Sequence, residues 1–198
     1  MFEHRQGILF VVSGPSGVGK GTINTRVVER TNNLMFSVSV TTRSARTGET
    51  NGKEYFFVSR EEFAALRDQD ELLEWALVYN NWYGTPRKFV YEQLETGHDV
   101  LLEIDIQGAM QVKQRYPEGV FVFIAPPSQE ELCNRITGRG KDKPEDIARR
   151  LAEYPEEIKC YVDYDYLVVN DEVEKATAKV LAIVEAERCR VQRIKEEC

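Results

Sequence analysis

Several short runs of apolar residues recur along the chain without the alternation of apolar and polar positions that marks a half-exposed strand. Segments with helical spacing lie between them, and the first begins at Gly19 and continues to about Arg30. Strands that are apolar on both faces and separated by helices are typical of a parallel sheet covered on both sides. The pattern therefore predicts a doubly wound α/β core, with strands at residues 8–12, 100–104, 120–125 and 166–170.

Further helices are predicted after the later strands. One lies around residues 107–115, and another begins near Ser128, which can act as its N-cap with Glu131 completing a capping box. The last segment, from about Val173 to Glu197, has the pattern of one long charged helix.

Two segments break this rhythm of strands and helices. Residues 36–90 contain short alternating pieces, 36-FSVSV-40 and 54-EYFFVS-59, and predict a small β-containing lobe inserted into the core. Residues 135–161 are first basic and then acidic, and they suit a mobile helical lid. The expected organisation is one domain over residues 1–198, with a core at about 1–35, 91–134 and 162–198.

Charge and composition narrow the range of partners. The 198 residues carry a formal net charge of −7 and the pI is about 5.1, which argues against a nucleic-acid polymer or an anionic membrane surface as the main partner. No apolar run approaches membrane-spanning length, and we expect no secretory signal. The four scattered cysteines form no CxxC pair and predict reduced thiols in a cytoplasmic protein. His4 and His98 are too far apart to suggest a metal site.

A glycine-rich loop follows the first predicted strand, with the sequence 13-SGPSGVGKGT-22. The spacing Gly14-xxxx-Gly19-Lys20 between a buried strand and a helix is the context that a phosphate-binding P-loop requires. Backbone N–H groups and the helix N-terminus would face phosphate oxygens, and Lys20 adds a full positive charge. The position after the lysine is Gly21 instead of Ser or Thr, so Mg²⁺ is expected to be held through water, by Thr22 or by carboxylates from another strand.

Those carboxylates have a candidate source at the end of the second strand, where Glu103 and Asp105 follow the run of apolar residues. Ligands of open α/β sheets bind at the carboxyl ends of the strands, and acidic residues there can hold Mg²⁺ or its waters. The alternative is a strand that simply emerges into solvent.

Basic and aromatic residues of the predicted lobe form two further candidates. Arg43 and Arg46, in 41-TTRSARTGE-49, can clamp one phosphate with bidentate bonds, although on these residues alone a solvated loop is the better interpretation. The segment 74-EWALVYNNWYGTPR-87 sets Glu74, Tyr83 and Thr85 among aromatic residues, which suits either a pocket for a planar base or an ordinary core edge.

The predicted lid carries four arginines. On a closing lid, arginines can neutralise a transferring phosphoryl group, but the same residues would be unremarkable on the surface of a helix. They are Arg135, Arg139, Arg149 and Arg150.

Taken in order, these motifs resemble those of the bacterial guanylate kinases along nearly the whole chain. Each motif is modest alone, but the ordered set is highly specific. The motifs are 13-SGPSGVGKGT-22, 37-SVSVTTRSARTGE-49, 51-NGKEYFFVS-59, 83-YGTPR-87, 103-EIDIQGA-109, 125-APPS-128, 138-GRG-140 and 167-LVVND-171.

The resemblance implies a P-loop parallel-sheet core, an inserted mixed α/β lobe that binds GMP, and a helical lid. It implies transfer of a phosphoryl group from ATP to GMP, and to dGMP, with Mg²⁺ as cofactor, in purine nucleotide metabolism and GMP recycling. The ATP-binding positions would be Gly14, Pro15, Ser16, Gly17, Val18, Gly19, Lys20, Gly21, Thr22, Arg135, Arg139 and Asn170. The GMP-binding positions would be Ser39, Arg43, Arg46, Tyr55, Glu74, Tyr83, Thr85, Glu103, Asp105 and Arg150.

Within that set, the resemblance also implies particular roles. The catalytic positions would be Lys20, Arg43, Arg139 and Arg150, and the metal positions would be Thr22 and Glu103. Glu103 stands where many members of the family have Asp, and Thr85 replaces the Ser of some members but keeps the hydroxyl.

Two other functions and two assembly states stay open at this stage. The chain could be a guanylate-kinase-like interaction module, although such modules typically have a degraded P-loop, or a kinase for another nucleoside monophosphate. The terminal helix can pack on its own core or on a second copy, so a homodimer is compatible with the sequence.

Overall fold

The structure, a computed structural model, describes residues 6–138 and 144–193, and its centre is a five-stranded sheet in the order β2-β7-β1-β8-β9. All four neighbouring pairs are parallel, which confirms the predicted core. The strands are β1 Leu9–Ser13, β2 Leu34–Phe36, β7 Asp99–Glu103, β8 Val120–Ala125 and β9 Tyr166–Val169.

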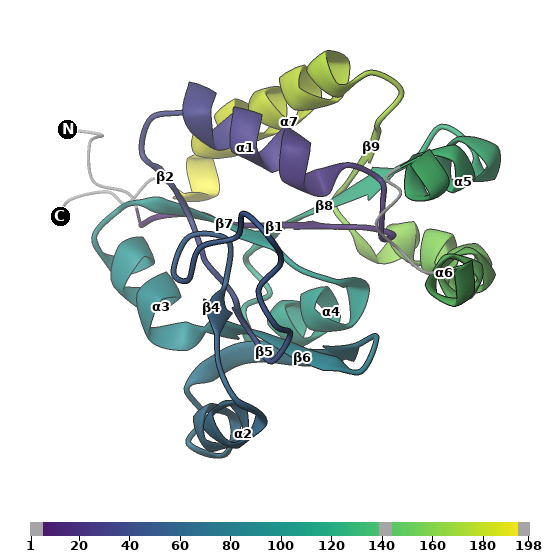
Figure 1. The fold of residues 1–198 in the computed structure, drawn as a ribbon. Helices are drawn as coiled ribbons and strands as arrows, with labels where there is room; N and C mark the ends of the chain where they lie inside the picture. Colours follow the sequence, from purple (N-terminus) through teal and green to yellow (C-terminus); the bar gives the residue numbers. More distant parts are fainter. Residues whose placement is uncertain (1–5, 139–143, 194–198) are drawn as a thin grey trace, which may run out of the picture.

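Helices cover both faces of this sheet (Figure 1). Side chains of the first apolar run point alternately to the two sides: Phe10 and Val12 belong to one hydrophobic cluster, and Leu9 and Val11 to another. Both faces exclude water, and this explains why the run is apolar at every position. The helices α1 Lys20–Arg30 and α7 Val173–Arg188 lie on one face, and α3 Arg87–Glu95 and α4 Ile106–Arg115 lie on the other.

The inserted lobe contains a second sheet, in the order β4-β3-β6-β5, with one parallel and two antiparallel pairs. A small separate core of Val40, Phe63 and Leu72 supports it. Its helix α2 begins after Ser59 with a complete capping box to Glu62. Its elements are β3 Val40–Thr41, β4 Phe56–Phe57, α2 Arg60–Asp68, β5 Leu72–Val78 and β6 Asn81–Pro86.

The alternating piece at residues 36–40 was assigned to the lobe, but the structure shares it between the two sheets. Phe36 ends β2 in the core sheet, and the N–H of Ser37 still donates to the Leu101 carbonyl oxygen at 3.0 Å. The chain then crosses to the lobe, where β3 begins at Val40. Within 54–59 the strand is also shorter than expected and comprises Phe56–Phe57.

The predicted lid region is helical wherever the structure describes it, in α5 Gln129–Gly138, α6 Pro144–Glu157 and the 3₁₀ helix η1 Ile158–Asp163. Ser128 caps α5 as predicted, since its hydroxyl oxygen accepts from the Glu131 N–H at 3.1 Å. The Glu131 carboxylate bonds Arg135 Nε at 2.8 Å, a contact between helical neighbours in place of the return bond of a capping box.

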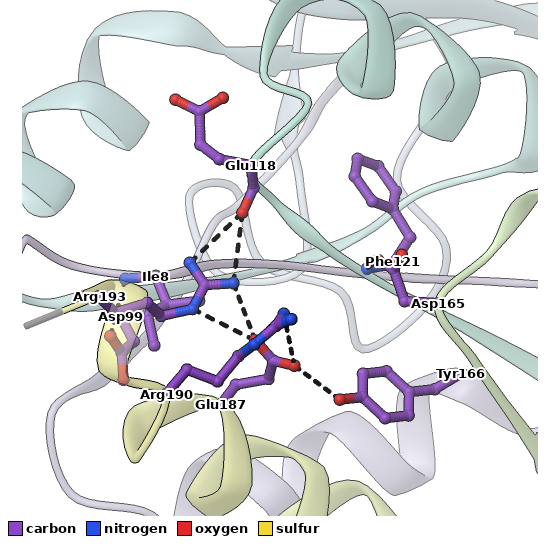
Figure 2. A network of polar contacts seen from close by, with 9 residues as sticks. All are labelled: Ile8, Asp99, Glu118, Phe121, Asp165, Tyr166, Glu187, Arg190 and Arg193. Carbon is purple, nitrogen blue, oxygen red and sulfur yellow. Dashed lines mark hydrogen bonds and ion pairs between the residues drawn. The ribbon is translucent and has the colours of Figure 1, made fainter.

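The C-terminal helix is shorter than predicted: it ends at Arg188, and Arg193 beyond it bonds back to Glu187 (Figure 2). Arg193, in the short 3₁₀ helix η2 Val191–Arg193, donates to the Glu187 carboxylate at 2.9 Å and to the Glu118 carbonyl oxygen at 3.3 Å. Glu187 also accepts from the Tyr166 hydroxyl at 2.6 Å and from Arg190 at 3.3 Å. These bonds fasten the end of α7 to the core.

Within residues 6–138 and 144–193, no helix has both the length and the apolar character needed to cross a membrane. Three cysteines in these ranges, Cys133, Cys160 and Cys189, are free thiols.

Candidate functional site

The glycine-rich loop lies between β1 and α1, as predicted, and its lysine folds over the loop. Lys20 Nζ donates to the carbonyl oxygens of Gly14 and Pro15, the latter at 3.0 Å. Gly19 caps the helix with a φ of 95°, a left-handed conformation that glycine adopts at little cost. The loop therefore ends at a helix N-terminus with a cation beside it, an arrangement suited to phosphate.

Two residues support the loop from outside. The Asn170 side chain, which is buried, donates to the Val18 carbonyl oxygen at 2.7 Å, and Arg135 Nη1 approaches the same oxygen at 3.5 Å. Both were expected to contact ATP. In this structure they contact the loop that carries the candidate phosphate site.

Glu103 ends β7 beside the first turn of α1. Its carboxylate accepts from Asn24 Nδ2 at 2.9 Å. A side chain at Gly21 would lie 3.6 Å from the same carboxylate, so the glycine keeps the space between them open. Thr22 is on the exposed side of α1. In the described ranges no group of three or more His, Cys, Asp or Glu side chains is placed to hold a metal ion.

The arginine loop is organised by an acid that the sequence reasoning did not identify. Both terminal nitrogens of Arg43 donate to the Glu49 carboxylate, each at 2.9 Å, and the Arg46 N–H donates to it at 2.8 Å. The Arg43 hydrogen bonds lower the pKa of Glu49, so this carboxylate stays ionised and holds the guanidinium in place.

Tyrosine rings complete this wall of the site. The Arg43 guanidinium lies 5.3 Å from the centroid of the Tyr55 ring, and Tyr55 meets Tyr83 edge to face at 5.8 Å. Burial raises the pKa of Tyr55 to about 12, so its hydroxyl keeps its proton and can donate to an anion.

Glu74, on β5, lies opposite Thr85 of β6, and only 2% of its surface is exposed. The Thr85 hydroxyl donates to Glu74 Oε1 at 2.7 Å. Burial raises the pKa of Glu74 to about 8, and the Thr85 bond opposes that rise only in part. Thr85 is fully buried and holds the carboxylate that faces the cavity.

The other side of this carboxylate is bounded by α4. Asp105 caps that helix, and its carboxylate accepts the Gly108 N–H at 2.8 Å. A Cβ atom at Gly108 would lie 2.3 Å from Glu74 Oε2, so only glycine lets Glu74 occupy this position. Burial also raises the pKa of Asp105, and two acids thus lie side by side at the end of the pocket.

A cavity of about 1040 Å³ joins these features, and it lies between the core sheet, the lobe and α6. Twelve of the predicted site residues line it. They are Gly14, Ser16, Lys20, Ser39, Arg43, Arg46, Tyr55, Glu74, Tyr83, Glu103, Asp105 and Arg150.

The remaining predicted residues lie elsewhere. Thr85 does not line the cavity and bonds Glu74, while Asn170 and Arg135 contact the Val18 carbonyl oxygen of the loop. Arg139 falls outside the described residues. The loop positions that do not line the cavity are Pro15, Gly17, Val18, Gly19, Gly21 and Thr22.

The residues that escaped the sequence reasoning include Glu49, Gly108 and Tyr79. Glu49 follows two arginines in one loop, a pattern that could have suggested an ion pair. Gly108 interrupts a helical pattern, which usually signals close packing. Tyr79 lines the cavity at a hairpin tip and had no local signal.

Comparison with known proteins agrees with this geometry. The family model for guanylate kinase matches residues 6–187. A curated guanylate kinase of Caldanaerobacter subterraneus subsp. tengcongensis is 53% identical over 97% of this chain and 93% of its own length. One of Syntrophomonas wolfei is 53% identical over 96% of this chain and 98% of its own.

A solved structure extends the match to three dimensions. The crystal structure of guanylate kinase from Anaplasma phagocytophilum is 36% identical, covers 98% of this chain and 92% of its own, and superimposes with a TM-score of 0.81. Sequence and fold agree over nearly the full length, and the chain therefore belongs to the guanylate kinase family.

Proposed function

We propose that this enzyme transfers a phosphoryl group from ATP to GMP, giving ADP and GDP. The observation that carries the proposal is the cavity itself, because one cavity is lined by Lys20 of the P-loop, by Arg43 and Arg46, and by buried Glu74. The contacts proposed below recognise the base and the phosphate, and dGMP is therefore expected to be a substrate as well.

At the phosphate end, the chain supplies position and charge and no covalent chemistry. An oxygen of the GMP phosphate attacks the γ-phosphorus of ATP, and ADP leaves. Lys20 and the loop N–H groups stabilise charge on the ATP phosphates, while Arg43, Arg46 and the hydroxyls of Tyr55 and Tyr83 hold the GMP phosphate. The fixed orientation of Arg43 by Glu49 supports this role, since a guanidinium already in place loses little entropy on binding.

Two lid arginines have roles on the same phosphates. Arg150 lines the cavity from α6 and would neutralise charge on the transferring group. Arg139, which lies outside the described ranges, is expected to have the same role.

At the base end, Glu74 selects guanine. Guanine presents two adjacent donors, N1–H and the 2-amino group, and a carboxylate can accept both. The raised pKa of Glu74, about 8, means that the free enzyme holds this acid largely protonated at neutral pH. Two donors from guanine would favour the ionised form, so we expect GMP binding to release its proton. Ser39 and Asp105 line the same cavity and complete the base contacts.

Mg²⁺ belongs to the proposal as the partner of ATP. Glu103 faces the space that Gly21 keeps open, and with Thr22 it would hold the ion through water, the remaining ligands being phosphate oxygens. Bound there, Mg²⁺ would neutralise charge on the phosphates.

The remaining expectations concern the setting of the enzyme. We place it in the cytoplasm, in purine nucleotide metabolism and GMP recycling, and the free thiols of Cys133, Cys160 and Cys189 support a reducing compartment. The apolar face of α7 packs into the core cluster of its own chain through Ala176 and Val180, so the proposal needs no second copy. A homodimer stays a prediction for light scattering to test.

A substrate panel tests the function. With saturating Mg-ATP, kcat/KM is measured for GMP, dGMP, IMP and AMP. We expect GMP and dGMP to be good substrates, IMP to be poor because it lacks the 2-amino group, and AMP to be worse by about 10⁴-fold. Absence of ADP release with GMP would support an interaction module instead, and equal use of AMP would support a kinase for another nucleoside monophosphate.

A further inference from the structure

The hairpin of β5 and β6 turns at Tyr79 and Asn80, and both residues have positive φ. The φ angles are 49° and 66°, and Val78 pairs with Asn81 across the turn. A two-residue turn of this kind favours Asn and Gly, because bulky side chains are strained in the left-handed region. A tyrosine at the first turn position is therefore unexpected on local grounds. Strain of this kind persists where surrounding contacts impose it, and it is concentrated at functional sites.

The contacts of the Tyr79 ring come from α6, toward which the hairpin tip points (Figure 1). The guanidinium carbons of Arg149 and Arg150 lie 4.5 Å and 5.0 Å from the centroid of the Tyr79 ring. The Tyr79 hydroxyl donates to Glu153 Oε2 at 3.3 Å. One turn of α6 thus meets the ring from three side chains, and the lobe touches the lid directly.

The position of this contact connects it to the chemistry. Tyr79, Arg150 and Glu153 all line the cavity that holds Lys20 and Glu74. The Tyr79 ring faces Arg150, and among the described residues this is the one lid arginine that lines the cavity. A ring packed against the guanidinium limits the rotation of that group within the cavity.

We propose that Tyr79 is a positioning residue, which latches the lobe to the lid and orients Arg150 over the reacting phosphates. The inference rests on the proposed phosphoryl transfer and deepens it. A closed lid keeps water from attacking the γ-phosphorus in place of GMP. Tyr79 accordingly couples ATP breakdown to GDP formation.

Variants of the turn separate this role from packing. Asn80→Gly, which relieves strain at the second turn position and leaves the ring, is the control. Tyr79→Asn in the same background creates Asn-Gly, the preferred sequence for such a turn, and removes the ring. Tyr79→Phe keeps the ring and removes the bond to Glu153.

We expect Tyr79→Asn/Asn80→Gly to match or exceed the control in Tm, while kcat with GMP falls about tenfold, as for the loss of two exposed cation–π contacts. With GMP present, ADP should form in excess of GDP, because water replaces GMP as acceptor in part of the turnovers. Tyr79→Phe should stay within about twofold of the parent in kcat and retain equal yields of ADP and GDP.

Two results would overturn the proposal. If Tyr79→Asn/Asn80→Gly keeps the control's kcat and equal yields of ADP and GDP, the ring does not position the lid. If its Tm falls well below that of the control, Tyr79 is a packing residue of the hairpin. Parent activity distinguishes the two proposals, since a parent that fails to phosphorylate GMP contradicts the function and not the latch alone.

Discussion

Glu74 and Glu187 are two buried glutamates, each only 2% exposed, in different regions of the molecule. Glu187 is at the end of α7, where Tyr166, Arg190 and Arg193 all donate to it (Figure 2). Burial would raise the pKa of Glu187, but these hydrogen bonds outweigh it and lower the pKa. For Glu74 burial prevails, and the pKa rises to about 8.

The two glutamates differ in the hydrogen-bond donors that offset the cost of burying a carboxylate. The chain itself supplies two cations and a hydroxyl to Glu187, so its charge is satisfied on folding. Glu74 receives the hydroxyl of Thr85 and has the acid Asp105 beside it, which raises its pKa further. A buried acid left this way costs stability, and such sites are characteristic of binding and catalysis. In the proposed function, guanine supplies the donors that the chain does not.

The largest expected effect is on activity. Glu74→Gln keeps the shape but presents a donor to one guanine N–H, and it removes two charge-assisted bonds. We expect kcat/KM for GMP to fall by about 10³-fold, as for two bonds of about 2 kcal/mol each. The GMP-to-AMP ratio should fall by at least about tenfold. A variant that keeps the parent's ratio would contradict the assignment of Glu74 to the base.

The mirror prediction concerns Glu187→Ala, which should cost stability and leave activity intact. It leaves the Tyr166 hydroxyl and Arg193 without their carboxylate, and we expect a loss of about 3 kcal/mol, or about 6–10 °C in Tm. The matched control is Glu185→Ala on the same helix, whose exposed ion pair with Arg188 should be worth about 0.5 kcal/mol at most. Equal losses of stability in Glu187→Ala and Glu185→Ala would contradict the stabilising role of the buried Glu187 carboxylate.

Proton release on binding sharpens the comparison. At pH 7 the free enzyme holds Glu74 mostly protonated, because its pKa is about 8. GMP binding should therefore release close to one proton from this site. Calorimetry in two buffers of different ionisation enthalpy measures the release, and Glu74→Gln accounts for protons from GMP itself. If parent and variant release the same number of protons, the proton does not come from Glu74.

The smallest expected effect is the dependence of Tm on pH. A carboxyl group with a raised pKa in the folded state contributes stability below its unfolded pKa, and that contribution is lost as pH rises through the folded pKa. Glu74→Gln should therefore raise the Tm of the ligand-free enzyme by about 2–5 °C at pH 8 and by less at pH 5.

Glu187 should behave in the opposite way, because its pKa is lowered on folding. Its contribution is present above the unfolded pKa of the group and is lost as the pH falls through the lower folded pKa. The Tm difference between the parent and Glu187→Ala should therefore shrink as the pH falls below about 4, near the ordinary pKa of Glu. A difference that stays constant down to pH 3 would contradict the lowered pKa.

Much of the fold follows from local sequence. The apolar runs of β1, β7 and β8 predicted buried parallel strands because both faces of each strand exclude water. The P-loop was predicted from the spacing of Gly14, Gly19 and Lys20. The point where the chain crosses from one sheet to the other was harder to predict. Residues 36–40 alternate like a single strand, yet they belong to two sheets. Alternation reports exposure to water and not which strand is the neighbour.

The site was predictable where the chemistry lies in a motif and hidden where partners are distant in sequence. Arg43 and Arg46 were visible, although the sequence alone favoured a solvated loop, and the geometry adds Glu49 as their anchor. Gly108 matters through one close approach to a carboxylate 34 positions earlier in the chain. The end of α7 at Arg188 depends on contacts of Arg193 that no helical pattern contains.

The core strands β1, β7 and β8, the glycine-rich loop and many of the residues that line the cavity were determined by the sequence itself, because hydrophobic periodicity and glycine spacing act within a few residues. Tertiary structure decided what the same side chain does in two places. Glu74 and Glu187 have identical chemistry and equally small exposed surfaces. Their pKa values move in opposite directions because Glu74 is desolvated more deeply and has fewer donors, whereas Glu187 has two cationic donors and a hydroxyl within a few ångströms. Those neighbours are brought together by folding.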